Sequence, residues 1–97
     1  MRLNPKKLLP YADYLWWESP QEAVKRPIRL LAQIMELGDY KDIQALTDSI
    51  GEEPFKAVLA NPPVGVFSVK SWYFWHYRLG IVTFPGDMPP LPQRTFV

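Results

Sequence analysis

The sequence predicts an all-α protein: a compact bundle of four to five short helices followed by an extended, proline-rich C-terminal arm. Two observations support this prediction. Apolar residues recur at three- and four-residue spacing in successive stretches, which is typical of amphipathic helices. Proline and glycine stand at the ends of these stretches, where they start or stop helices. The 97 residues suit one domain, so we expect a helical domain over 1–84 and a tail over 85–97 that packs on it or extends from it.

Prolines keep the first two predicted helices short. Apolar residues around Leu15 predict a helix over 10–17 that starts at Pro10, because proline is tolerated in a first turn. The next helix starts after Ser19, which has a proline directly behind it and a glutamate three residues further on. Pro27 ends this helix, since its ring would break an interior hydrogen bond.

The next two helices have the clearest boundaries. A helix over 27–37 opens with proline, carries a wide apolar stripe that indicates a central position, and stops at Gly38. Asp39 is placed to cap a helix over 40–50, and Gly51 ends it.

Two further helices complete the predicted bundle. One begins at a pair of glutamates followed by Pro54 and stops at 61–63; the last runs over 69–79, between the cap Ser68 and the stop Gly80. The predicted core comprises Leu15, Trp16, Ile28, Leu31, Ile34, Met35, Ile43, Leu46, Ile50, Phe55, Val58, Leu59, Trp72, Trp75 and Leu79.

The chain beyond the last helix is predicted to be extended. Residues 81–84 favour one short extended segment, and the four prolines of 85–97 favour polyproline II. We expect the tail prolines to pack on the chain's own tryptophan and tyrosine rings, with a free arm as the alternative.

Six consecutive ring-bearing residues, 72–77, fall in the last helix. A helix turns about 100° per residue, so such a run points in every direction. One side, with Trp72 and Trp75, is expected in the core, while the other rings are either half-exposed edges of that core or an interface with a partner or a second copy. The predicted partner-binding residues are Tyr73, Phe74, Tyr77 and Arg78.

The composition argues against several classes of function. Cysteine is absent, which excludes disulfides and thiolate chemistry and fits a reducing cytoplasm. His76 is the single histidine, and we expect its ring to bond a backbone carbonyl near the tail. The sequence shows no nucleophile–base pair, phosphate loop or metal-ligand set, so we expect no enzyme activity, cofactor, metal site or small-molecule substrate. Neither a membrane span nor a signal peptide is predicted.

One alternative function is DNA binding. The segment 43–60 has the helix–glycine–helix spacing of a helix-turn-helix motif, so the chain could be a transcriptional regulator. Against this, the second helix begins with Glu52 and Glu53, which face phosphates badly, and the net charge is only +1. Nucleic acid is therefore the disfavoured partner.

Three motifs also carry a family resemblance: Trp16-Trp17, the helix over 27–38 that is followed by aspartate, and the aromatic stretch 71–80. Across roughly 11–80, the chain resembles a family of small bacterial proteins whose genes often lie beside nucleotidyltransferase-like toxins of the AbiEii/AbiGii type. The resemblance implies an antitoxin-like or accessory binding role and names no catalytic residue. We therefore expect a non-enzymatic protein–protein interaction domain, working in the cytoplasm.

Overall fold

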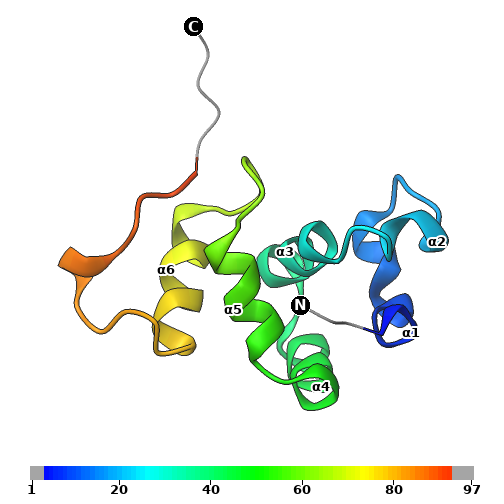
Figure 1. Ribbon diagram of the computed structural model, residues 1–97, viewed down its shortest axis with the longest axis horizontal. Coiled ribbons are helices and arrows are strands. Elements are labelled where there is room, and N and C mark those ends of the chain that lie inside the picture. Colours follow the sequence, from blue (N-terminus) through cyan, green and yellow to red (C-terminus); the bar gives the residue numbers. More distant parts are fainter. Residues whose placement is uncertain (1–3, 93–97) are drawn as a thin grey trace, which may run out of the picture.

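The structure, a computed structural model, describes residues 4–92 and holds helices without strands in that range (Figure 1). The all-α prediction is confirmed. In chain order the elements are α1 (Pro5–Leu8), the 3₁₀ helix η1 (Leu9–Leu15), α2 (Pro20–Ala23), α3 (Pro27–Leu37), α4 (Tyr40–Ile50), α5 (Glu53–Ala60), α6 (Val69–Arg78) and the 3₁₀ helix η2 (Pro85–Asp87). Residues 93–97 of the predicted tail lie outside the described range.

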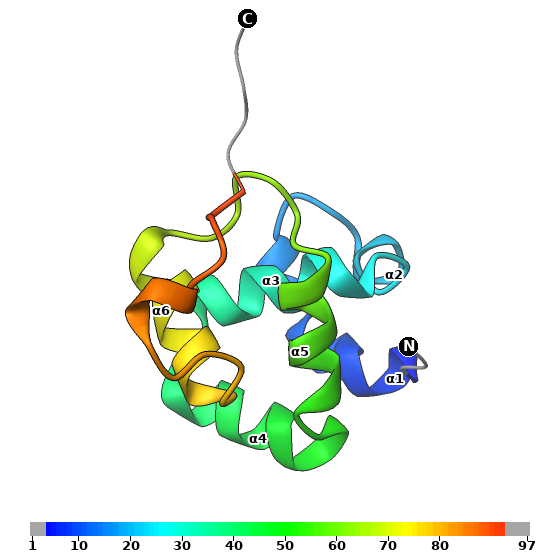
Figure 2. The same cartoon turned by 60° about the vertical axis from the view of Figure 1, so that its left-hand side comes forward.

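Helix α3 is the centre of the fold. It packs against η1 on one side and against α5 and α6 on the other, as two views show (Figures 1 and 2). The predicted central position is confirmed, because five of its eleven side chains are buried. These five are Leu30, Leu31, Ala32, Ile34 and Met35.

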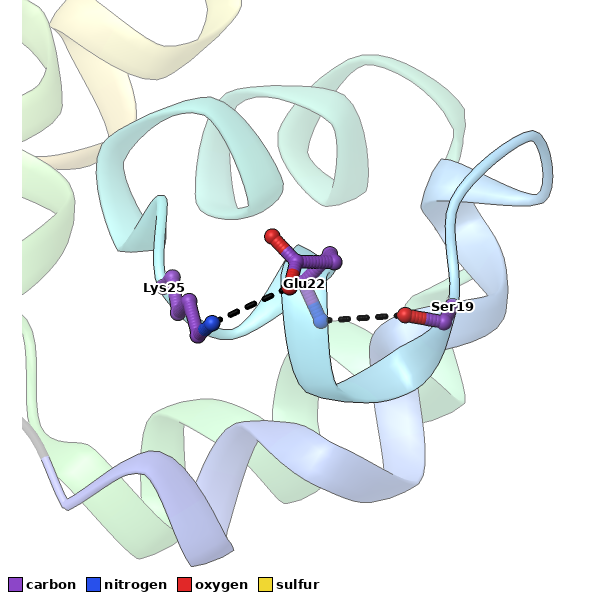
Figure 3. A network of polar contacts seen from close by, with 3 residues as sticks. All are labelled: Ser19, Glu22 and Lys25. Atoms are coloured by element: carbon purple, nitrogen blue, oxygen red, sulfur yellow. Dashed lines mark hydrogen bonds and ion pairs between the residues drawn. The ribbon is translucent and has the colours of Figure 1, made fainter.

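Side-chain caps fix the starts of three helices at the predicted residues. The hydroxyl of Ser19 accepts a hydrogen bond from the backbone N–H of Glu22 at 3.3 Å, and the Glu22 carboxylate in turn pairs with Lys25 at 3.0 Å (Figure 3). Asp39 and Ser68 cap α4 and α6 in the same way, at 2.8 Å and 3.2 Å. Each cap satisfies an N–H that has no partner inside its helix.

The first helix differs from its prediction. An α-helical turn begins at Pro5, capped by Asn4, and the chain then continues as a 3₁₀ helix straight through Pro10. A 3₁₀ helix has three residues per turn, so Leu15 lies in line with the buried Ala12, while Trp16 is rotated away from both. Trp16, predicted to be core, is 77% exposed, and that prediction is wrong.

Most of the predicted core is confirmed. Twelve of its fifteen members are buried, Ile28 and Ile50 are partly buried, and Trp16 is exposed. The core also contains residues that were not predicted: Leu8, Ala12, Ala23, Leu30, Ala32 and Phe67.

Residues 81–84 were predicted to form one short extended segment, but the structure has no such element there. The N–H groups of Ile81 and Val82 both donate to the carbonyl of His76, at 3.0 Å and 3.3 Å. They thereby satisfy a carbonyl at the end of α6, which has no partner inside the helix. Gly80 permits this reversal by adopting a φ of 70°.

Helix α3 ends at Gly38, where the backbone becomes extended, and a steric reason makes glycine the residue that fits there. Its φ is −66°, so the left-handed conformation is not involved, but a Cβ at this position would lie 2.5 Å from the Ile34 carbonyl oxygen. We predict that Gly38→Ala lowers the free energy of unfolding by about 1–2 kcal/mol, because backbone atoms must move to relieve the overlap. Gly86→Ala is the control, since a Cβ there meets nothing within 4 Å. Equal urea midpoints for the two variants would contradict the prediction.

Within residues 4–92, no helix combines the length and apolar character needed to cross a membrane.

Candidate functional site

Two neighbouring residues of α3 hold α6 in place. The indole N–H of Trp75 donates to the Met35 carbonyl at 2.9 Å, in the buried interior. That carbonyl lies in the last turn of α3, where it has no partner within the helix. Beside it, the Glu36 carboxylate accepts from both the backbone N–H and the hydroxyl of Ser68, at 2.9 Å and 3.2 Å. The start and the middle of α6 are therefore fixed to the end of α3.

The inner side of α6 is part of the core, as predicted. Trp72, Trp75 and Leu79 are 2%, 1% and 8% exposed. The Trp75 ring stacks on Phe55 of α5, with centroids 5.5 Å apart and planes 14° from parallel. These contacts determine which side of α6 is left for solvent.

His76 is buried on this inner side, and its ring bonds a backbone carbonyl as predicted, but that carbonyl belongs to its own helix and not to the region near the tail. Its Nδ1 lies 2.7 Å from the Trp72 carbonyl, one turn back in the same helix. A carbonyl only accepts hydrogen bonds, so Nδ1 must carry the proton. Across residues 4–92, no group of three or more His, Asp or Glu side chains could hold a metal ion.

The opposite side of α6, which we call the outer face, consists of the four predicted partner-binding residues: Tyr73, Phe74, Tyr77 and Arg78. Their three rings are 41%, 51% and 39% exposed, in that order, and Arg78 is exposed as well. The two tyrosines pack against each other with centroids 6.4 Å apart. The Arg78 guanidinium lies 6.0 Å from the centre of the Phe74 ring, within range of a cation–π contact.

The outer face borders a shallow hollow of about 190 Å³. Phe74 and Arg78 line it together with Tyr40, which is 72% exposed, and Gly38. Tyr40 is not among the residues predicted for the site. The only sequence signal was an aromatic residue directly after the cap Asp39, and nothing local indicates that the start of α4 lies beside α6.

A second exposed aromatic pair lies between η1 and α2. Trp16 and Trp17 are 77% and 47% exposed, and their rings meet edge to face with centroids 5.3 Å apart. Figure 1 places the segment that joins η1 and α2 at the opposite end of the molecule from α6. Trp16 therefore offers a matched control for substitutions on the outer face.

The segment 43–60 does form two helices joined at Gly51, whose φ is 80°. Half of α5 is buried against the core, and its exposed start carries Glu52 and Glu53. Lys56 pairs with Glu53 at 3.5 Å, so its charge is partly compensated. Negative charge at this end of α5 repels phosphate.

One polar contact ties η1 to α4. The Tyr14 hydroxyl donates to Oδ2 of Asp42 at 2.6 Å, beside an open hollow of about 250 Å³. Burial and the hydrogen bond to this carboxylate together raise the pKa of Tyr14 from 10.0 to about 12. Both effects favour the neutral phenol.

The raised pKa of Tyr14 predicts a loss of stability in alkali. The folded chain holds the phenol proton of Tyr14 more tightly than the unfolded chain does. The contribution of Tyr14 to the free energy of unfolding is therefore complete below pH 10 and falls as the pH rises from 10 to about 12. Tyr14→Phe should weaken this dependence in urea unfolding. If the variant and the parent chain lose stability in parallel over this interval, the Tyr14–Asp42 contact is not the source of the loss in alkali.

Comparison with known proteins gave no match: no family model, no curated protein and no solved structure matches the chain.

Proposed function

We propose that this protein is a non-enzymatic interaction domain that binds a protein partner, or a second copy of itself, through the outer face of α6. The observation that supports this proposal is a row of rings, Tyr73, Phe74 and Tyr77, each exposed by 39–51%. Tyrosine and other large rings bury much area at little cost in conformational freedom, and they are common at interface hot spots. The bonds that fix α6 to α3 reduce that cost further, since the face is already ordered.

The partner class that we propose follows from the family resemblance. It is a nucleotidyltransferase-like protein, for which this chain would act as an antitoxin-like or accessory subunit in the cytoplasm of a bacterium. The absence of cysteine is compatible with that reducing compartment. Arg78 adds a cation at the edge of the rings, which suits a partner surface with a carboxylate at its rim.

The test compares partner capture by three tagged chains. The parent chain, Phe74→Glu/Tyr77→Glu and Trp16→Glu are expressed in the native host, and the proteins retained are identified by mass spectrometry. We expect the double variant to lose a nucleotidyltransferase that the parent and Trp16→Glu both retain. Light scattering on the same three purified chains measures whether each one associates with itself.

Two results would refute the proposal. One is capture that is unchanged in Phe74→Glu/Tyr77→Glu, together with an unchanged molecular mass. The other is retention of DNA by the parent chain with gel retardation at low salt, which would favour the helix-turn-helix interpretation of 43–60.

A further inference from the structure

Residues 85–92, the described part of the C-terminal arm, run beside α6 (Figures 1 and 2). After the turn of η2, Met88 adopts φ −66° and ψ 122°, close to polyproline II. The indole N–H of Trp72 then donates to the carbonyl of Pro89 at 2.9 Å. Met88 and Leu91, on either side of this bond, pack against the core.

This contact combines the elements by which proteins bind proline-rich ligands. Such ligands dock on aromatic rings as preformed extended segments, and their carbonyl oxygens are free to accept because polyproline II makes no internal hydrogen bonds. Here Trp72 supplies both a ring and a donor, and Phe67 lies beside it with centroids 5.6 Å apart. Trp72 and Phe67 are 2% and 7% exposed in the structure. Pro89 and Pro90 are exposed, so the apolar contacts of the arm come from Met88 and Leu91.

The arm is held lightly along its described length. The Trp72–Pro89 bond is the one side-chain hydrogen bond found between residues 85–92 and the helices. Met88 and Leu91 are only partly buried, and all three residues of η2 are exposed. Segments with few buried contacts open at low cost without unfolding the rest of a protein.

We propose that Trp72 and Phe67 form a binding site for an extended, proline-rich peptide, and that Met88–Leu91 of the same chain occupy and close it. A proline-rich segment of a partner protein would bind by replacing the arm. This site lies on the inner side of α6, next to the arm, and is separate from the outer face. A tethered segment competes at an effective concentration on the order of millimolar, so the closed chain should bind such peptides weakly.

The experiment opens the site in the full-length chain with Met88→Asp/Leu91→Asp, which places charges at the two apolar anchors. The probe is a fluorescent peptide with the sequence of residues 87–92, and its binding is measured by anisotropy. We expect the opened variant to bind it at least about tenfold more tightly than the parent, since the tethered competitor is removed. A peptide with alanine in place of the prolines is the matched control and should bind more weakly, because it keeps both apolar anchors but loses the preformed extended conformation.

Trp72→Phe in the opened variant should weaken peptide binding by about tenfold, since it removes the indole donor, while Trp16→Phe should leave binding unchanged. The parent chain provides a test that needs no substitution: peptide above about a millimolar should shift the Trp72 indole N–H resonance.

Three results would overturn the proposal. The first is no peptide binding by an opened variant whose quenching shows Trp72 exposed. The second is a Met88→Asp/Leu91→Asp variant whose tryptophans are no more exposed to quencher than those of the parent, together with a Trp72 indole N–H resonance of the parent that does not shift when peptide is added. The third is a parent dimer that becomes monomeric in Met88→Asp/Leu91→Asp, which would assign the site to the arm of a second copy.

Discussion

Trp75→Ala is expected to lower the free energy of unfolding by about 3–5 kcal/mol, the largest effect we predict for one substitution. Three losses coincide at this position: a ring that is 1% exposed, its stacking on Phe55, and the hydrogen bond to the Met35 carbonyl. A domain of this size has a stability of about 5–15 kcal/mol, so the variant should be close to unfolded at room temperature. Urea unfolding followed by circular dichroism measures the change.

Trp75→Phe separates the hydrogen bond from the packing. Most of the ring remains, but the Met35 carbonyl loses its donor, and an unsatisfied buried group of this kind costs about 1–3 kcal/mol. The matched control is Trp16→Phe, at an exposed ring, which should change stability by less than about 0.5 kcal/mol. If Trp75→Phe were as stable as the parent, the Met35 contact would not be needed to anchor α6.

Glu36→Ala is expected to have the second largest effect, a loss of about 2 kcal/mol. The Glu36 carboxylate accepts two hydrogen bonds from Ser68, and bonds to a charged group contribute about 1.5–3 kcal/mol each before exposure to solvent reduces them. Removing it also leaves the Ser68 backbone N–H without this partner, directly before the first turn of α6. Amide hydrogen exchange should therefore increase first at the start of α6 and only later elsewhere.

A double-mutant cycle with Ser68→Ala gives the control for that prediction. Ser68→Ala removes the cap of α6 and the hydroxyl hydrogen bond to Glu36, but it keeps the backbone N–H of residue 68, from which the Glu36 carboxylate accepts a hydrogen bond. The two substitutions should therefore be non-additive, with a coupling above about 0.5 kcal/mol. Strict additivity would mean that the Ser68 hydroxyl bond does not contribute to the effect of Glu36, which would then act through the Ser68 backbone N–H alone.

Local chemistry explains why so many helix boundaries could be predicted. The caps Ser19, Asp39 and Ser68 and the stops Gly51 and Gly80 act within four residues, so a single sequence shows them. The prediction for the segment before Trp16 was wrong, because the choice between an α-helix and a 3₁₀ helix there depends on how the segment packs against α3 and α2. That packing is not visible in local spacing.

The candidate site also has a part that local sequence predicts and a part that depends on long-range packing. Helical periodicity within α6 indicated that Tyr73, Phe74 and Tyr77 would be left outside once Trp72 and Trp75 entered the core. Tyr40 and Phe74 line one hollow only because the start of α4 lies near α6, and these two segments are far apart in the sequence. The same holds for the Trp72 bond to the arm, which joins residues 17 positions apart.

The four tryptophans form two natural spectroscopic reporters. Trp72 and Trp75 are enclosed away from water, so their emission should be shifted to short wavelengths, whereas Trp16 and Trp17 face water and should emit at longer wavelengths. A spectrum of the unlabelled chain can therefore distinguish loosening around α6, which removes the blue component, from an event at the other end, which alters the red one.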